Sequence, residues 1–305
     1  MRRHPELKAY FALSAVCFFW GTTYLGIRMS LETFPPLVLV AARFILSGSI
    51  LMTAAVARGA RLPRGRELWH AAFSGILILS VGNGCLTFAE LWIPSGLAGL
   101  IITLSPFWLV GIEAVMPGGE RLHAPTIFGM IVGFAGVALL VSSGVGSGGF
   151  SHTALIGFLL LQVGMVSWSF GSIYQRRRQA EAHPIVVGAV QQLASGLAAL
   201  PFALLFGSHH ITWSTRGVAA LFYLMTFGSI VGYSAYAYAL DRLPVAVVSI
   251  YPYVNSVVAV TLGWLFYREP FGRREALAML VIFAGVALVK WQSGKAALAR
   301  IEVEA

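Results

Sequence analysis

The sequence predicts an all-α, polytopic membrane protein with ten transmembrane helices in two inverted-topology five-helix repeats. Hydrophobic residues make up 58% of the 305 residues and charged residues only 11%, whereas a soluble domain is about half apolar and about a quarter charged. The apolar runs are about 20 residues long, the length that spans a bilayer core of roughly 30 Å. The net charge of +9 is therefore a signal of topology in a lipid bilayer, and nucleic-acid binding is not expected.

Ten apolar runs of this kind follow one another along the chain. They cover residues 9–29, 36–57, 68–91, 94–116, 124–143, 153–174, 185–207, 217–240, 244–267 and 272–291. The first run is longer than the apolar part of a signal peptide, and no cleavage site of small residues follows it, so we expect an uncleaved first span. The link GVGSGGFS at 144–151 separates a first repeat, 1–147, from a second, 148–305.

The two repeats are visible as a recurring stretch of sequence. Residues 20–48 reappear 148 positions later as residues 168–196, with Trp, Arg, Pro, Ser and Gly at matching places. Later in each half, FAGVAL occurs at 134–139 and again at 283–288. A repeat of five spans crosses the membrane an odd number of times, so the second copy enters from the opposite side. Many secondary transporters are built in this way, with their substrate site near the midplane between the copies.

Positive charges predict the orientation of the chain. Fifteen of the 21 Lys and Arg residues fall on the side that holds both chain ends, five fall on the other side, and Arg43 lies within a span. Because Lys and Arg concentrate on the cytoplasmic side, both termini are expected to be cytoplasmic. The link at 267–275, YREPFGRRE, is the weak point, since it carries three of the five basic residues of the outer side.

Arg43 is the sharpest single indication of a site. It lies about two turns into the second span, where a charged side chain is costly unless it is paired or faces water. An anion-binding or gating Arg in a central cavity is one interpretation. The alternative is a structural Arg that extends toward the membrane surface or bonds the carbonyls of a neighbouring helix.

Depth in the membrane extends this argument to other side chains. Trp20 and Asn83 are expected at the level of Arg43, and their repeat counterparts are Trp168, Gln191 and Tyr233. The chamber between the repeats is expected to be lined by Trp20, Arg43, Asn83, Trp108, Trp168, Gln191, Tyr233, Tyr236 and Tyr253. The aromatic residues would contact an apolar group of a small-molecule substrate, and Arg43 a carboxylate or phosphate. Core packing is the alternative for the aromatic residues.

Two further residues are candidates for gating or coupling. Pro106 lies mid-span, where it frees a backbone carbonyl for a polar contact or only kinks the helix. None of the acidic residues falls at mid-depth of an expected span, and Glu90 and Glu113 both lie near a span end. A proton relay at mid-depth is therefore not expected, and Glu90 instead is a candidate to pair with Arg43 at the outer end.

Several other functions lack their sequence signals. The histidines lie in tails, loops or span ends, so neither a metal site nor a cofactor is expected. A membrane-embedded enzyme would need a cluster of mid-depth carboxylates or histidines, which the sequence does not contain, so the chain is not expected to be an enzyme. A substrate-specific channel stays open as an alternative to a transporter, and a monomer and a homodimer are both compatible with the sequence.

Over nearly its whole length the chain resembles the EamA-type permeases of the drug/metabolite transporter superfamily. The matching motifs are FWGTTYLGIR at 19–28, PP at 35–36, ARF at 42–44, VGNG at 81–84, AE at 89–90, PSG at 94–96, Pro106, YVN at 253–255 and the two FAGVAL segments. The resemblance implies a ten-span protein of the bacterial inner membrane that exports small metabolites or amino acids by alternating access. One departure is Ser256 after Asn255, where family members usually have Pro.

Overall fold

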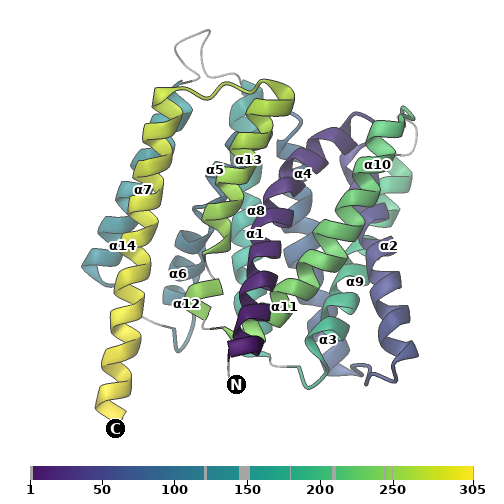
Figure 1. Cartoon of the computed structure of the whole chain (residues 1–305), viewed down its shortest axis with the longest axis horizontal. Helices are drawn as coiled ribbons and strands as arrows, with labels where there is room; N and C mark the ends of the chain where they lie inside the picture. Colours follow the sequence, from purple (N-terminus) through teal and green to yellow (C-terminus); the bar gives the residue numbers. More distant parts are fainter. Residues whose placement is uncertain are drawn as a thin grey trace.

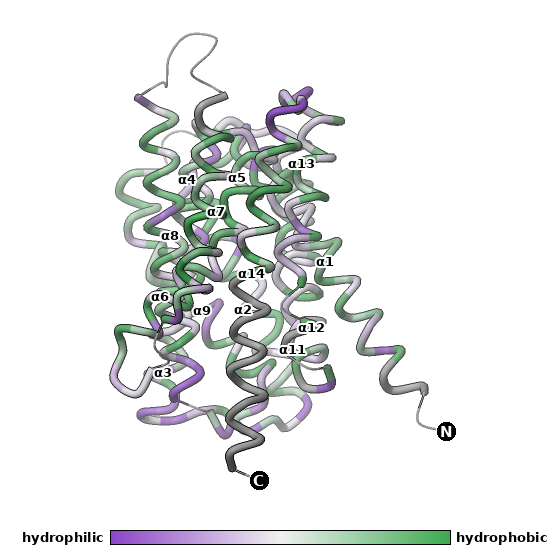
Figure 2. Tube along the Cα trace, turned by 90° about the vertical axis from the view of Figure 1, so that its left-hand side faces the viewer, coloured by the Kyte–Doolittle hydropathy of each residue, from purple (hydrophilic) through white to green (hydrophobic). Residues whose placement is uncertain are grey.

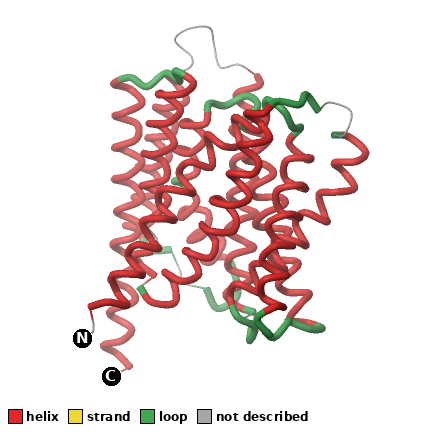
Figure 3. The backbone as a smooth tube through the Cα atoms, turned by 45° about the vertical axis from the view of Figure 1, so that its right-hand side comes forward, coloured by secondary structure: helices red, strands yellow, loops and turns green. Residues whose placement is uncertain are grey.

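Within its described residues, the computed structural model is built from helices joined by short loops (Figure 3). It describes residues 3–119, 122–143, 152–178, 180–207, 211–243, 245–248 and 250–304. The predicted link at 144–151 and Pro244 lie outside these ranges. The helices of the first half are α1 (Arg3–Leu31), α2 (Pro36–Ala57), α3 (Arg66–Gly75), the π-helix η1 (Ile76–Asn83), α4 (Gly84–Ala89), α5 (Ser95–Ile102), α6 (Ser105–Val115) and α7 (Ala124–Ser143).

The second half repeats this order of elements. Its helices are α8 (His152–Arg177), α9 (Pro184–Phe206), α10 (Thr215–Tyr223), the π-helix η4 (Leu224–Val231), α11 (Gly232–Arg242), α12 (Val245–Val248), α13 (Tyr251–Tyr267) and α14 (Arg273–Glu304). The start of α1 and the end of α14 lie at the same end of the bundle (Figure 1).

Seven stretches of the described chain are long and apolar enough to cross a membrane. They are Leu7–Leu31, Pro36–Ala57, Arg66–Ala89, Ser95–Val115, His152–Arg177, Pro184–Phe206 and Thr215–Leu240. The helices at the other predicted spans, 124–143, 244–267 and 272–291, are not among these seven, and Ala124–Leu139 forms a shorter apolar helix. Hydrophobic residues cover most of the length of the helices, and hydrophilic residues gather mainly near the ends of the bundle (Figure 2).

Two predicted spans are interrupted where a proline begins a new helix. In the first half α5 ends at Ile102 and α6 begins at Ser105, so Pro106 lies in the first turn of α6. In the second half α12 ends at Val248, and Pro252 lies in the first turn of α13. Proline is favoured at that position because it has no N–H to leave unbonded. Pro106 therefore starts a helix segment instead of kinking a continuous one, and Pro252 has the matching place.

The second helices of the two halves, α2 and α9, pack closely along each other. A Cβ added at Gly48 would lie 2.7 Å from the backbone N of Leu193, and one added at Gly196 would lie 2.6 Å from the backbone N of Ile45. These contacts are reciprocal, since both pairs of residues are related by the 148-residue repeat. As the residue number rises along α2 it falls along α9, so the two helices are antiparallel.

The last helices of the two halves form a second pair of the same kind (Figure 1). A Cβ at Gly136 would lie 2.8 Å from the backbone N of Ile282, and one at Gly285 would lie 2.4 Å from the backbone N of Gly133. Here too the contact is reciprocal, and α7 and α14 are antiparallel. Small residues allow such close approach of helix backbones in membranes.

The π-helices also occupy matching places. η1 and η4 lie 148 residues apart, each inside a span-length stretch. η1 packs against α8 and α9 of the second half, while η4 packs against α1 and α2 of the first. π-helical turns are rare and frequently mark functional sites. The residues around η1 and η4 are therefore candidates for the functional site.

We expect Gly48→Ala to lower the free energy of unfolding, because the new methyl group would meet the backbone of α9. The loss should be about 1–3 kcal/mol, as for other overpacked cores. Thermal unfolding in detergent, followed by tryptophan fluorescence, measures it. Gly84→Ala is the matched control, since a Cβ there meets nothing within 4 Å. Equal stability of the two variants would contradict the close α2–α9 packing.

Candidate functional site

Arg43 of α2 is buried in the middle of the bundle, where it contacts the π-helix η4. It is 6% exposed, and its Nε donates to the Ser229 hydroxyl at 2.9 Å. Its guanidinium carbon lies 5.0 Å from the centre of the Phe44 ring. Among the described residues, no carboxylate lies within ion-pair distance of Arg43. The remaining N–H groups of a buried cation are thus available for an anionic ligand.

Trp20 of α1 contacts the same π-helix at Gly228, the residue before Ser229. Its indole Nε1 donates to the carbonyl oxygen of Gly228 at 2.9 Å, and a Cβ at Gly228 would lie 2.9 Å from Nη2 of Arg43. The Trp20 ring centre lies 5.1 Å from those of both Tyr236 and Tyr251. Trp20 therefore contacts η4 at the residue that Arg43 approaches, and it links η4 to the aromatic rings of α11 and α13.

Gln191 of α9 is the centre of a polar network that joins α9 to α3, α8 and α11. Its Nε2 donates to the Ser74 hydroxyl at 3.1 Å and to Gln175 Oε1 at 2.8 Å, and its Oε1 accepts from the Tyr233 hydroxyl at 2.9 Å. Its neighbour Gln192 instead accepts a hydrogen bond from Ser47 of α2. The two glutamines therefore face different helices, and Gln191 has its hydrogen bonds satisfied within the protein.

The remaining predicted chamber residues are more scattered. Asn83, at the end of η1, has a buried Oδ1 without a hydrogen-bond partner. Trp168 packs beside η1, since a Cβ at Gly82 would lie 3.3 Å from its Cε3. Trp108 of α6 donates to Gln162 of α8 at 3.1 Å, and the Tyr253 ring lies edge-on against Phe283 of α14. Trp108 and Tyr253 thus contact α8 and α14, whereas Arg43 lies on α2 and bonds η4.

Glu90 does not form the expected ion pair with Arg43. It is completely buried in the turn between α4 and α5, and neither of its carboxyl oxygens has a hydrogen-bond partner. Its backbone carbonyl oxygen instead accepts a hydrogen bond from Arg28 of α1. Glu113, at the other end of the bundle, pairs with Arg176. Depth in the membrane suggested the Arg43–Glu90 pair, but Arg43 is turned toward η4.

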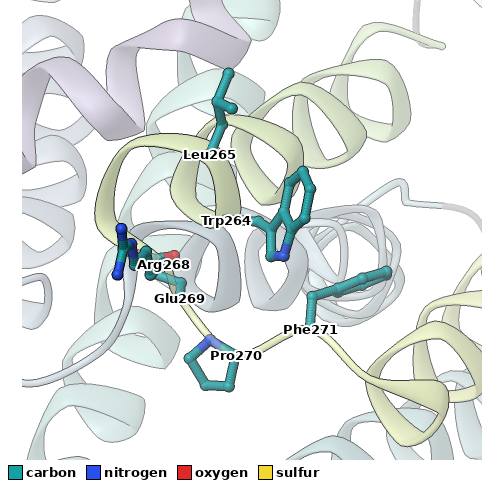
Figure 4. Close-up of a pocket in the computed structure, with 6 residues that line it drawn as sticks. All are labelled: Trp264, Leu265, Arg268, Glu269, Pro270 and Phe271. Carbon is teal, nitrogen blue, oxygen red and sulfur yellow. The ribbon is translucent and has the colours of Figure 1, made fainter.

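A surface hollow lies at the end of α13, and none of the predicted chamber residues lines it (Figure 4). It has a volume of about 450 Å³ and is lined by Trp264, Leu265, Arg268, Glu269, Pro270 and Phe271. Arg268 has a left-handed backbone with φ of 51°, which is uncommon for a residue other than glycine. The described part of the chain contains no group of three or more His, Cys, Asp and Glu residues that would hold a metal ion.

Several contact residues, among them Ser229, Gln175 and Tyr251, were not in the predicted chamber. Ser229 and Gln175 are single polar residues within apolar or basic stretches, and nothing in the sequence marks them as partners of Arg43 and Gln191. Tyr251 is one of several Tyr residues in the second half, and its stacking on Trp20 depends on how α13 is rotated. Together, Arg43, Trp20, Tyr236, Tyr233 and Gln191 form one connected band around η4 and α11.

Comparison with known proteins places the chain in a transporter family. The model of the EamA-like transporter family matches it twice, over residues 7–142 and 155–291. The chain therefore belongs to this family, and it is a membrane transporter. This confirms the resemblance that the motifs indicated.

The individual relatives agree with this assignment. The uncharacterized inner membrane transporter YedA of Escherichia coli (strain K12) is 35% identical over 291 residues, covering 95% of this chain and 92% of the relative. A protein of the same organism named "Probable amino-acid metabolite efflux pump" is 25% identical over 280 residues, 88% of this chain and 89% of the relative. A solved crystal structure shares the fold, with a TM-score of 0.67 at 24% identity over 94% of this chain and 98% of the other.

We expect Tyr233→Phe to lower the free energy of unfolding by about 1–3 kcal/mol, the usual cost of leaving a buried acceptor unbonded. The acceptor is Oε1 of Gln191. Thermal unfolding in detergent measures the change. Tyr236→Phe is the control, since it keeps the ring contact with Trp20 and removes a hydroxyl that is not bonded to any described residue. If Tyr236→Phe lowered the free energy of unfolding by the same amount, the hydrogen bond from Tyr233 to Gln191 would not be what stabilises α11.

Proposed function

We propose that the protein is a secondary transporter that exports small metabolites or amino acids by alternating access through a central chamber between two inverted repeats. The observation that carries the proposal is Arg43, a buried cation with one described acceptor, Ser229. A charged group in a membrane is costly unless it has a partner or faces water. A substrate carboxylate or phosphate would be that partner when it enters the chamber.

The helix pairs support the inverted arrangement. Equivalent helices from the two halves, α2 with α9 and α7 with α14, are antiparallel and meet through reciprocal glycine contacts. Reciprocity of this kind is what a two-fold axis between equivalent units produces. An axis in the membrane plane would relate a repeat at 1–147 to one at 148–305, each with five spans, and ten spans would return both termini to the cytoplasmic side.

The chemistry of the band around η4 suits an amphipathic substrate. Arg43 offers charged N–H donors, and the buried Oδ1 of Asn83 is an acceptor without a partner. Trp20 bonds the same π-helix as Arg43, and its ring, with those of Tyr236 and Tyr251 against it, provides a flat apolar surface. An amino acid or a related metabolite carries both a charged end and an apolar part, which is why this substrate class is favoured.

Polar contacts between the two halves at both ends of the bundle support a mechanism in which the two ends open alternately. At the end opposite the termini, Thr33 of the first half bonds Ser214 of the second at 2.6 Å, and Glu32 lies 3.6 Å from Arg216. At the end that holds the termini, Glu113 of the first half pairs with Arg176 of the second. Both ends are therefore bridged between the halves, and opening either would break a small number of polar contacts.

A channel is the competing function, and counterflow separates the two. Purified protein in liposomes would be tested with labelled amino acids, nucleosides and sugar phosphates. A transporter gives saturable uptake that is stimulated by unlabelled substrate on the far side of the membrane. Flux that neither saturates nor shows such stimulation would contradict alternating access.

We expect Arg43→Ala to reduce counterflow of substrates with a carboxylate or phosphate by about 10- to 100-fold, since a hydrogen bond to a charged group contributes about 1.5–3 kcal/mol. Arg43→Lys should retain part of the flux because it keeps the charge without the planar group. The measurement is the initial rate of counterflow in liposomes containing equal amounts of protein.

Arg274→Ala is the matched control. Arg274 is exposed and forms no ion pair with any described residue, so its loss should leave the rate unchanged. An Arg43→Ala protein that folds and transports at the full rate would overturn the role assigned to Arg43.

A further inference from the structure

Glu90 is a buried acid whose carboxyl group the protein does not satisfy. It follows the span Arg66–Ala89 as the first residue of the turn to α5. It has no exposed surface, and both of its carboxyl oxygens are without a hydrogen-bond partner. An ionised carboxylate in such a place would lose its hydration without compensation, so the neutral acid is strongly favoured.

The charged groups around Glu90 come from α1 and from the loop between α13 and α14. Arg28 of α1 is next to it, but its Nη1 donates to the backbone carbonyl oxygen of Glu90 and not to the carboxyl group. Glu269 approaches from the loop between α13 and α14, where it lines the surface hollow (Figure 4). Burial raises the pKa of the Glu90 carboxyl, Arg28 opposes this, and Glu269 adds to it.

Glu269 is not free to take Arg28 as a partner. Its carboxylate oxygens accept from the backbone N and hydroxyl of Ser95 and from the backbone N of Gly96, each at 2.8 Å. It therefore caps the first turn of α5, where a negative charge is stabilised by the helix N–H groups. A fixed negative charge near Glu90 is a second reason for the Glu90 carboxyl to hold a proton.

The other helices beside this turn bring no charge to Glu90. Tyr24 of α1 is close enough to Glu90 to interact with it electrostatically, but a phenol carries no charge at neutral pH. α8 passes the turn at Gly157, where a Cβ would lie 2.8 Å from Ile93. α2 carries Arg43, whose guanidinium bonds Ser229 of η4. Among the described residues, Arg28 is therefore the cation placed to neutralise an ionised Glu90.

We propose that Glu90 binds a proton in this conformation and releases it when the end of the bundle opposite the termini opens. On opening, the carboxyl O–H bond breaks and its proton passes to the entering water. Arg28 moves from the carbonyl oxygen of Glu90 to the carboxylate oxygens of the same residue. Closing reverses both steps, with the proton taken from water at that end. The proposal rests on the alternating access proposed above.

The consequence is a dependence of transport on the pH at that end of the protein. A high proton concentration there stabilises the protonated, closed arrangement, and a low one favours the open arrangement with the Arg28–Glu90 ion pair. The turn that holds Glu90 joins the stretch containing η1 to the interrupted helix α5–α6. Proton binding therefore acts on the turn between a π-helical stretch and an interrupted helix.

Infrared spectroscopy tests the protonation without any substrate. We expect wild-type protein in detergent at neutral pH to show the C=O band of a protonated carboxyl group, and Glu90→Gln to lack it. Glu181→Gln is the control, since the Glu181 side chain is 80% exposed and forms an ion pair with Arg61 at the surface. A spectrum with no protonated carboxyl band, or with a band unchanged in Glu90→Gln, would overturn the proposal.

Counterflow measured over a range of pH tests its coupling to transport, using whichever amino acid, nucleoside or sugar phosphate shows saturable flux in the wild type. The wild-type rate should fall at least several-fold as the pH at the outer end is lowered, and the Glu90→Gln rate should be insensitive to it. Glu181→Gln should follow the wild type. Identical pH profiles for wild type and Glu90→Gln would contradict the inference, whereas absence of saturable flux in the wild type would contradict the proposed function itself.

Discussion

The close approach of α2 and α9 is the contact on which the rest of the structure depends. Gly48 and Gly196 have no side chain to separate the two backbones, and each faces the helix that carries the other. Membrane helices associate largely through packing, since lipid offers apolar surface as readily as protein does. This packing brings Ser47, Gln192 and the neighbouring Arg43 and Gln191 to the centre of the bundle. A larger residue at either glycine would move the polar groups apart before it exposed any of them.

The two sides of this centre have different chemistry. Gln191 is bonded to Ser74, Gln175 and Tyr233, so its side chain is fixed by the protein. Arg43, its repeat counterpart in the first half, has one described acceptor, Ser229, and approaches η4 at Gly228, where Trp20 also bonds. We therefore interpret the Gln191 side as scaffold and the Arg43 side as the place for a ligand. A preference for anionic substrates would then come from the first repeat alone.

Much of this could be predicted from the sequence because hydrophobicity and charge report depth in a membrane. The apolar runs located most of the helices, although two runs are interrupted and α14 continues to Glu304. The recurrence of residues 20–48 at 168–196 predicted that α2 and α9 are equivalent helices, but not that they pack against each other. The same sequence could not show how each helix is rotated about its axis. For that reason Glu90 was a candidate partner for Arg43, although the two side chains point to different neighbours. The π-helices were also not predicted, because one extra residue in a turn leaves the apolar pattern almost unchanged.

Inverted topology is the claim that the whole account needs, and labelling from each side of the membrane tests it most directly. Glu32 and Glu181 follow the first helix of each half, and both are exposed. Single cysteines at these positions, in protein with Cys17 and Cys85 replaced by alanine, would be treated with an impermeant thiol reagent in sealed vesicles. The account predicts that Glu32→Cys is labelled from one face of the membrane and Glu181→Cys from the other. Labelling of both from the same face would contradict it.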